Sequence, residues 1–135
     1  RRSATSPKDI STKMKPPVQN IRVSQRGKDA LQRLKNRTGI DNWNVLCRWA
    51  VSASLAMDTP PPRWIAQEES NIDMDWKTFG GDQAETLSGL IHLSAEKHGE
   101  SNPDTLPAFF RAHLERGINA IQNVRKLSDM TLLAR

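Results

Sequence analysis

The sequence lacks several residue types and patterns that define large protein classes. It has 135 residues, no tyrosine and a single cysteine, Cys47, so an intrachain disulfide is excluded and a reducing compartment is indicated. It contains no run of about 18 apolar residues that would predict a transmembrane helix, and no apolar segment typical of a secretory signal. Phosphate-binding glycine loops, paired-cysteine zinc patterns and the HExxH zinc motif are also missing. We therefore expect a cytoplasmic protein that binds no membrane, cofactor or metal.

Acidic residues are scarce in the first part of the chain. Residues 1–48 hold twelve basic residues and three acidic ones, a net charge of +9, whereas residues 49–135 hold eight basic and twelve acidic residues, a net charge of −4. Such a separation of charge indicates a surface for a polyanion, either nucleic acid or an anionic membrane. A basic tail that only aids solubility is the alternative, but the excess continues into a segment that is expected to fold.

The hydrophobic pattern predicts a mainly α fold, a small helical domain of about four helices with a short N-terminal strand. Alternation over residues 20–24 predicts the strand, and the helix that follows it gives the chain a start like that of a ribbon-helix-helix protein. The four helices are predicted at residues 25–38, 43–57, 83–98 and 107–127, and residues 63–82 are predicted to form an irregular central insert. The chain is thus divided into a flexible basic arm (1–17), one helical domain (18–128) and a C-terminal tail (129–135).

Individual residues predict how these helices begin, end and pack. Ser24 is expected to cap the first helix and Gly39 to end it. Gly117 is expected to permit close contact between the fourth helix and a neighbour. A core or interface position is expected for His113, and a buried thiol for Cys47. Packing, rather than stacking on bases, is the favoured role of the four tryptophans, Trp43, Trp49, Trp64 and Trp76.

Basic residues near the start of the domain form the strongest functional signal. Helical spacing places Arg26, Arg33 and Arg37 along one edge of an apolar stripe, and Lys28 and Lys35 along its other edge. Cations in such rows bind phosphates and release counterions, and they position a protein on DNA without reading its sequence. The candidate DNA-binding residues are Lys13, Lys15, Arg22, Arg26, Lys28, Arg33, Lys35 and Arg37.

A weaker pattern lies on the third predicted helix. Glu85, His92 and Glu96 fall on one polar face at i, i+7 and i+11. Residues of these types could form a metal site or supply a general base. A solvated helix face is the favoured reading of this pattern. A metal-dependent nuclease that uses these three residues therefore stays as an alternative function.

Four stretches of the chain resemble, in order, the DNA sulfur modification protein DndE family. They are IRVSQRGKDALQRLKNRTGI, NVLCRWAVSASL, FGGDQAETLSGLI and LPAFFRAHLERGINAI, and the resemblance extends over about residues 18–125. The resemblance implies a small, mostly helical and oligomeric protein, with a tetramer favoured. It also implies a subunit of the bacterial phosphorothioation machinery, in which sulfur replaces a non-bridging phosphate oxygen of DNA.

The resemblance further implies a protein that binds double-stranded DNA, with a preference for nicked duplex, and that is not itself an enzyme. Its partners would be the other proteins of the phosphorothioation complex, at the bacterial nucleoid. Lysines are the family's main DNA contacts. The resemblance therefore assigns DNA contact only to the matching first helix, which holds Lys28 and Lys35. The long basic arm and the tryptophan-rich segment around residues 60–77 depart from the family's pattern.

Two further alternatives remain open at this point. In a ribbon-helix-helix repressor, paired strands from two subunits would enter the major groove, and Asn20, Arg22 and Ser24 would read bases. Such a repressor would prefer one operator over random duplex by roughly 10³-fold or more. A scaffold that binds only proteins would show no salt-dependent affinity for DNA.

Overall fold

The computed structural model describes residues 15–124, which form a two-stranded antiparallel sheet and several helices. The prediction of a mainly α fold with a short N-terminal strand is confirmed. Most of the predicted arm, including Lys13, and the predicted tail at 129–135 lie outside the described residues. In chain order the elements are β1 (Asn20–Ser24), α2 (Gln25–Thr38), α3 (Trp43–Leu55), β2 (Glu69–Asp75), α4 (Trp76–Gly80), the 3₁₀ helix η1 (Gly81–Gln83), α5 (Ala84–Lys97) and α6 (Leu106–Ile121).

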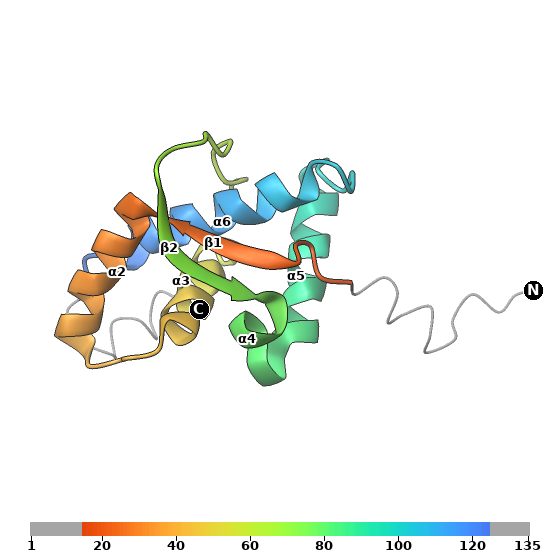
Figure 1. The fold of residues 1–135 in the computed structure, drawn as a ribbon. Coiled ribbons are helices and arrows are strands. Elements are labelled where there is room, and N and C mark those ends of the chain that lie inside the picture. Colours follow the sequence, from red (N-terminus) through yellow and green to blue (C-terminus); the bar gives the residue numbers. More distant parts are fainter. Residues whose placement is uncertain (1–14, 125–135) are drawn as a thin grey trace, which may run out of the picture.

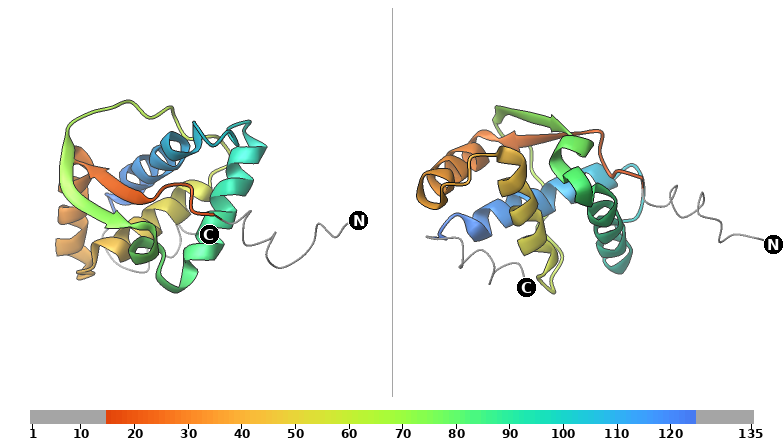
Figure 2. Two further views of the ribbon diagram at one scale, coloured as in Figure 1. Left: turned by 45° about the vertical axis from the view of Figure 1, so that its right-hand side comes forward. Right: turned by 90° about the horizontal axis from the view of Figure 1, so that it is seen from below.

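The two-stranded sheet lies across one side of α3 and α6, and α2 and α5 lie at opposite ends of the molecule (Figures 1 and 2). α3 packs most extensively against α6. The core under the sheet contains a cluster of Trp76, Phe79 and Phe110, whose ring centroids are 5.0 to 5.7 Å apart. This arrangement buries one face of α2 and leaves its other face exposed at one end of the molecule.

The β1–α2 junction forms as the sequence predicts. Ile21 and Val23 point into the core and are almost fully buried. Ser24 caps α2 by accepting a hydrogen bond from the Gly27 N–H at 2.9 Å, and Gly39 ends the helix with a φ of 77°. A residue with a side chain is strained at such a positive φ, which explains the glycine. The strand therefore passes directly into the helix without an intervening loop.

The irregular central insert is shorter than predicted. Residues 56–68 have no regular structure, but the segment predicted to be irregular also contains β2, α4 and η1. In β2, Ser70 and Ile72 are buried while their neighbours are exposed. β2 pairs antiparallel with β1, with Arg22 opposite Asp73. The hydrogen bonds to this distant partner stabilise a strand that contains few strongly strand-forming residues.

Gly117 lies at the closest approach of α6 to α3, which confirms its predicted role. A Cβ atom at this position would overlap the backbone carbonyl of Ala50, closer than the 3.0 Å that real Cβ atoms keep. The two helix backbones meet at this point because neither residue has more than a methyl group there. The contact fixes how α3 and α6 cross and therefore how the whole core is packed.

α6 ends at Ile121, earlier than the predicted end at residue 127. The Val124 N–H donates to the carbonyl oxygen of Ile121 at 3.0 Å, which turns the chain away from the helix axis. Arg37 then donates from Nε to the carbonyl oxygen of Val124 and from Nη2 to that of Gln122. A cation from α2 thus satisfies carbonyl groups that a longer helix would have used internally.

His113 is buried between α3, α5 and α6, and its hydrogen bonds determine its tautomer. Arg116 Nε donates to Ser54 Oγ at 2.8 Å, so the Ser54 hydroxyl proton is directed to His113 Nδ1, 2.7 Å away. Nδ1 is therefore unprotonated, and Nε2–H donates to Ser94 Oγ at 3.0 Å. Burial, with the positive charges of Arg116 and His98 nearby, lowers the pKa of His113 to about 4. The structure confirms the predicted core histidine.

Candidate nucleic-acid interface

A groove between α2 and α6 brings two of the predicted arginines together. Arg26 and Arg33 lie on the exposed side of α2, about 10 Å apart along its axis at 1.5 Å per residue. Both line the groove, which has a volume of about 430 Å³, together with Gln67, Asn119 and Gln122. Neither arginine has a hydrogen-bond or ion-pair partner among residues 15–124. Two uncommitted guanidinium groups beside amide donors are suited to bind anionic oxygens.

One acidic residue, Glu115, also lines this groove, but its carboxylate is held by internal partners. Glu115 accepts hydrogen bonds from the Ser24 N–H at 3.1 Å and the Ser24 hydroxyl at 2.8 Å. It also forms an ion pair with Arg111, whose Nε lies 3.2 Å away. Glu115 therefore attaches the start of α2 to α6, and it shares Arg111 with Glu69, which also forms an ion pair with that arginine. Sequence reasoning missed this pair, although the i, i+4 spacing of Arg111 and Glu115 was visible.

The other predicted cations of α2 have protein partners. Lys28 Nζ donates to Asn71 Oδ1 at 2.7 Å, and Lys35 Nζ lies over the Trp43 ring, 4.6 Å from its centroid. Arg37 is bound to the end of α6. Among the five predicted cations of α2, Arg26 and Arg33 are therefore the two without a protein partner within residues 15–124.

Arg22 lies on the exposed face of the sheet, where acidic residues reduce its charge. Its Nε donates to the carbonyl oxygen of Ser70 at 2.7 Å across the sheet. Asp73 is its direct partner in the register, and Asp75 lies opposite Asn20 at the end of the strand pair. The face formed by Arg22 and these two carboxylates therefore has a net charge of −1, unlike the basic exposed side of α2.

The pairing of β1 argues against the ribbon-helix-helix alternative. In that fold the strands of two subunits pair with each other, whereas β1 pairs with β2 of its own chain. Ser24, one of the three residues that would read bases, is fully buried and bonded to Glu115 and the Gly27 N–H. The resemblance to a ribbon-helix-helix start is therefore confined to the order of the elements.

The residues of the alternative nuclease site take no metal-binding arrangement. His92 Nε2 lies 2.8 Å from the carbonyl oxygen of Lys15 and so connects α5 to the segment before β1. Within residues 15–124, no group of three His, Cys, Asp or Glu side chains is placed to hold a metal ion. The side chain of Lys15 is exposed at the same end of the molecule.

No helix in the described part of the chain has the length and apolar character that a membrane span requires.

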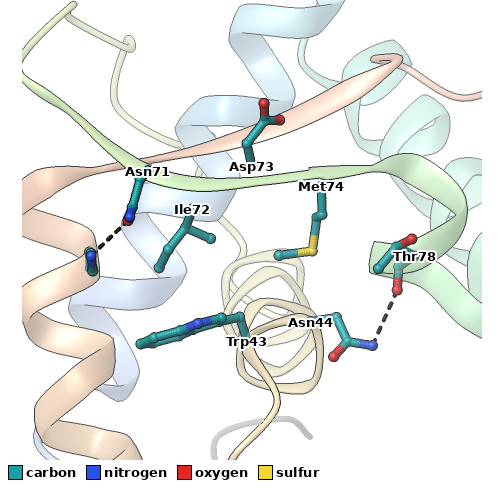
Figure 3. A pocket seen from close by; sticks show the side chains of 8 residues that line it. Trp43, Asn44, Asn71, Ile72, Asp73, Met74 and Thr78 are labelled. Carbon is teal, nitrogen blue, oxygen red and sulfur yellow. Dashed lines mark hydrogen bonds between the residues drawn. The ribbon is translucent and has the colours of Figure 1, made fainter.

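A second hollow, of about 400 Å³, lies on the lysine edge of α2 (Figure 3). Its lining comes from α2, α3, β2 and α4, so residues far apart in the sequence meet there. Sequence reasoning did not single out the two asparagines of this lining, because polar residues at such positions give no periodic signal. The lining residues are Lys28, Trp43, Asn44, Asn71, Ile72, Asp73, Met74 and Thr78.

Comparison with known proteins agrees with this architecture. The crystal structure of DndE from Escherichia coli B7A, described as involved in DNA phosphorothioation modification, has a TM-score of 0.61 and 22% identity. A glycine-to-lysine mutant of DndE, described as involved in DNA phosphorothioation, has a TM-score of 0.59 and 20% identity. Each alignment covers 78% of this chain and 98% of the other chain. No curated protein matches the chain in sequence.

The two solved structures share the fold of this chain at low identity, so the family assignment comes from the sequence match. The family of the DNA sulphur modification protein DndE matches residues 20–129. This range extends from β1 to beyond α6 and includes every helix and strand described above. The chain therefore belongs to the DndE family of DNA sulphur modification proteins.

Proposed function

We propose that this chain is the non-enzymatic DNA-binding subunit of the bacterial phosphorothioation machinery and that it contacts the phosphate backbone of duplex DNA. Membership of the DndE family places it in DNA phosphorothioation. The proposed partners are double-stranded DNA, with nicked duplex preferred, and the other proteins of the machinery, in the cytoplasm at the nucleoid. The proposed assembly is a homo-oligomer, a tetramer, because several copies of the groove on one particle would strengthen binding.

The main support for the proposal is the pair of arginines in the groove between α2 and α6, which have no protein partner among residues 15–124. Arg26 and Arg33 are exposed and lie on the basic N-terminal part of an otherwise acidic chain. Their separation along α2 equals the axial rise of roughly three nucleotides, at 3.4 Å per nucleotide, for an α2 that lies parallel to the duplex axis. Secondary contacts are proposed for the other predicted cations, which are Lys13, Lys15, Arg22, Lys28, Lys35 and Arg37.

Two buried groups support a role without covalent chemistry. Burial raises the pKa of the Cys47 thiol to about 12, so this residue supplies almost no thiolate nucleophile near neutral pH. His113 is occupied on both ring nitrogens, and its protonated Nε2 faces Ser94. It therefore cannot act as a base toward the Ser94 hydroxyl without breaking its bond to Ser54.

Replacing both groove arginines, Arg26→Ala with Arg33→Ala, is expected to weaken binding to a random-sequence duplex by about 10-fold or more. The reason is the loss of two charge-assisted contacts, each worth roughly 1 kcal/mol or more. Fluorescence anisotropy with a labelled duplex, at one fixed salt concentration, measures the change. The same measurement on nicked and intact duplexes of one sequence tests the proposed preference for nicks.

The matched control removes the same charge from elsewhere on the surface. Lys77 and Lys97 are exposed on α4 and α5, outside the groove, and the double variant Lys77→Ala with Lys97→Ala should bind duplex within about 3-fold of the unchanged protein because it retains the groove contacts. If the two double variants lose affinity equally, binding depends on net charge alone and the proposed groove is wrong. Cleavage of plasmid DNA with Mg²⁺ or Mn²⁺ would contradict the non-enzymatic role, provided that Glu96→Ala and His92→Ala abolish it.

A further inference from the structure

The hollow between α2, α3, β2 and α4 has the size and the mixed lining of a small-ligand site. Its volume of about 400 Å³ lies within the range usual for such sites. Trp43, Ile72 and Met74 supply apolar surface from two elements, and Figure 3 shows the Trp43 ring lying below Ile72. An aromatic ring beside aliphatic side chains favours a flat apolar ligand, since such a ligand can stack on the indole.

Neighbouring residues hold the Trp43 ring in place beside the hollow. Trp43 is half-buried against the core, which fixes the ring, and it still lines the hollow. Lys35 Nζ lies over one face of the ring, 4.6 Å from its centroid, and does not line the hollow, so a base would stack on the opposite face. The ammonium group of Lys28 donates one hydrogen bond to Asn71, and Lys28 lies at the edge of the same hollow. Asp73 is the one carboxylate of the lining, and in Figure 3 its side chain points to the side of β2 opposite Ile72 and Trp43. The ligand should therefore present a flat ring to Trp43 and an anionic group to Lys28.

The two asparagines leave one donor and one acceptor without a partner. Asn71 Oδ1 accepts from Lys28, so its Nδ2 is left to donate. Asn44 Nδ2 donates to the carbonyl oxygen of Thr78 at 3.2 Å, so its Oδ1 is left to accept. No partner for either free atom occurs within residues 15–124. In Figure 3 the two amides lie on either side of Trp43, and the Asn44 oxygen is on the Trp43 side.

From this lining we propose that the hollow binds one unpaired nucleobase of a DNA strand, stacked on Trp43 and hydrogen-bonded by Asn44 and Asn71. A base carries hydrogen-bonding groups on more than one edge, and those of its Watson–Crick edge are accessible only when the base is unpaired. Lys28, at the edge of the hollow, contacts a flanking phosphate. The inference rests on the proposed DNA-binding function and deepens it, because it names a ligand that an intact duplex does not present.

The test compares three labelled duplexes of one sequence by fluorescence anisotropy: fully paired, with one bulged adenosine, and with a bulged abasic residue. The unchanged protein should bind the bulged adenosine about 5- to 100-fold more tightly than the abasic bulge, the range expected for stacking one base. Trp43→Ala should reduce this ratio to less than about 2-fold, because it removes the stacking surface. Asn71→Ala removes one hydrogen bond and should lower the ratio by about 2- to 10-fold. Asn71 is exposed, so its replacement leaves the core intact. Trp49→Ala, the control from the same helix, should keep the ratio because Trp49 lies outside the hollow.

The other outcomes of this experiment would contradict either the inference or the proposed function on which it rests. Equal affinity for the adenosine and abasic bulges, or a ratio that survives Trp43→Ala, would overturn the inference while leaving phosphate binding intact. If none of the three duplexes binds at low salt, the proposed function fails and the inference fails with it. Displacement of the bulged duplex by an equal concentration of free dAMP would assign the hollow to a free nucleotide and overturn its assignment to DNA.

Discussion

Replacing Gly117 with alanine is expected to lower the free energy of unfolding by about 3 kcal/mol or more, the upper end of the range for overpacked cores. The new Cβ would overlap the carbonyl group of Ala50, and backbone atoms cannot turn aside as a side chain can. α3 and α6 would have to separate, and the core that they share would lose contacts along its length.

Urea unfolding followed by circular dichroism measures this change, and two variants make the cause specific. Asn119→Ala, at an exposed position of the same helix, should change the free energy of unfolding by less than about 0.5 kcal/mol. Adding Ala50→Gly to Gly117→Ala should not restore stability, since the overlap is with the backbone of residue 50. A Gly117→Ala protein as stable as the original would show that the two helices are not in close contact.

Lowering the pH from 7 to 5 is expected to reduce the free energy of unfolding by about 2 kcal/mol through His113 alone. Its pKa is about 4 in the folded protein, against an ordinary value near 6.5 in the unfolded chain. Between these values the unfolded chain binds a proton that the folded protein does not, so stability falls as the pH falls. Protonation of Nδ1 would also leave the Ser54 hydroxyl proton without its acceptor.

Unfolding measured in urea at several pH values between 7 and 5 tests this expectation. The window lies above the range in which most carboxylates titrate, so they contribute little to the slope. His113→Gln should be less stable at pH 7 and should lose the pH dependence, whereas His92→Gln should keep it. A flat profile for the unchanged protein would mean that His113 is as accessible to protons in the folded state as in the unfolded chain.

The elements with local signals were predictable from the sequence. Ser24 and Gly39 define the ends of α2 through caps that depend on a few neighbouring residues. Ile21 and Val23 alternate with polar residues, so the strand was visible, and Gly117 was recognisable as a small residue on an apolar face. For the caps and the strand, the physical cause lies within one turn or one strand of the residue itself, whereas the partner of Gly117 is Ala50 on α3.

Features that depend on distant segments were not predictable in this way. β2 is a strand because β1 pairs with it, and its own residues favour that state only weakly. The carbonyl groups after α6 are satisfied by Arg37, from a different helix. The unequal roles of the cations of α2 also depend on distant partners, because Asn71 and the carbonyl groups after α6 engage some of them.

The salt dependence of duplex binding tests the central claim most directly, namely that Arg26 and Arg33 contact DNA phosphates. The logarithm of the binding constant falls with the logarithm of the salt concentration by about 0.9 for each phosphate neutralised. The double variant Arg26→Ala with Arg33→Ala should therefore have a slope that is less steep by about 1.8, while Lys77→Ala with Lys97→Ala keeps the original slope. A slope unchanged by removal of both groove arginines would contradict the claim.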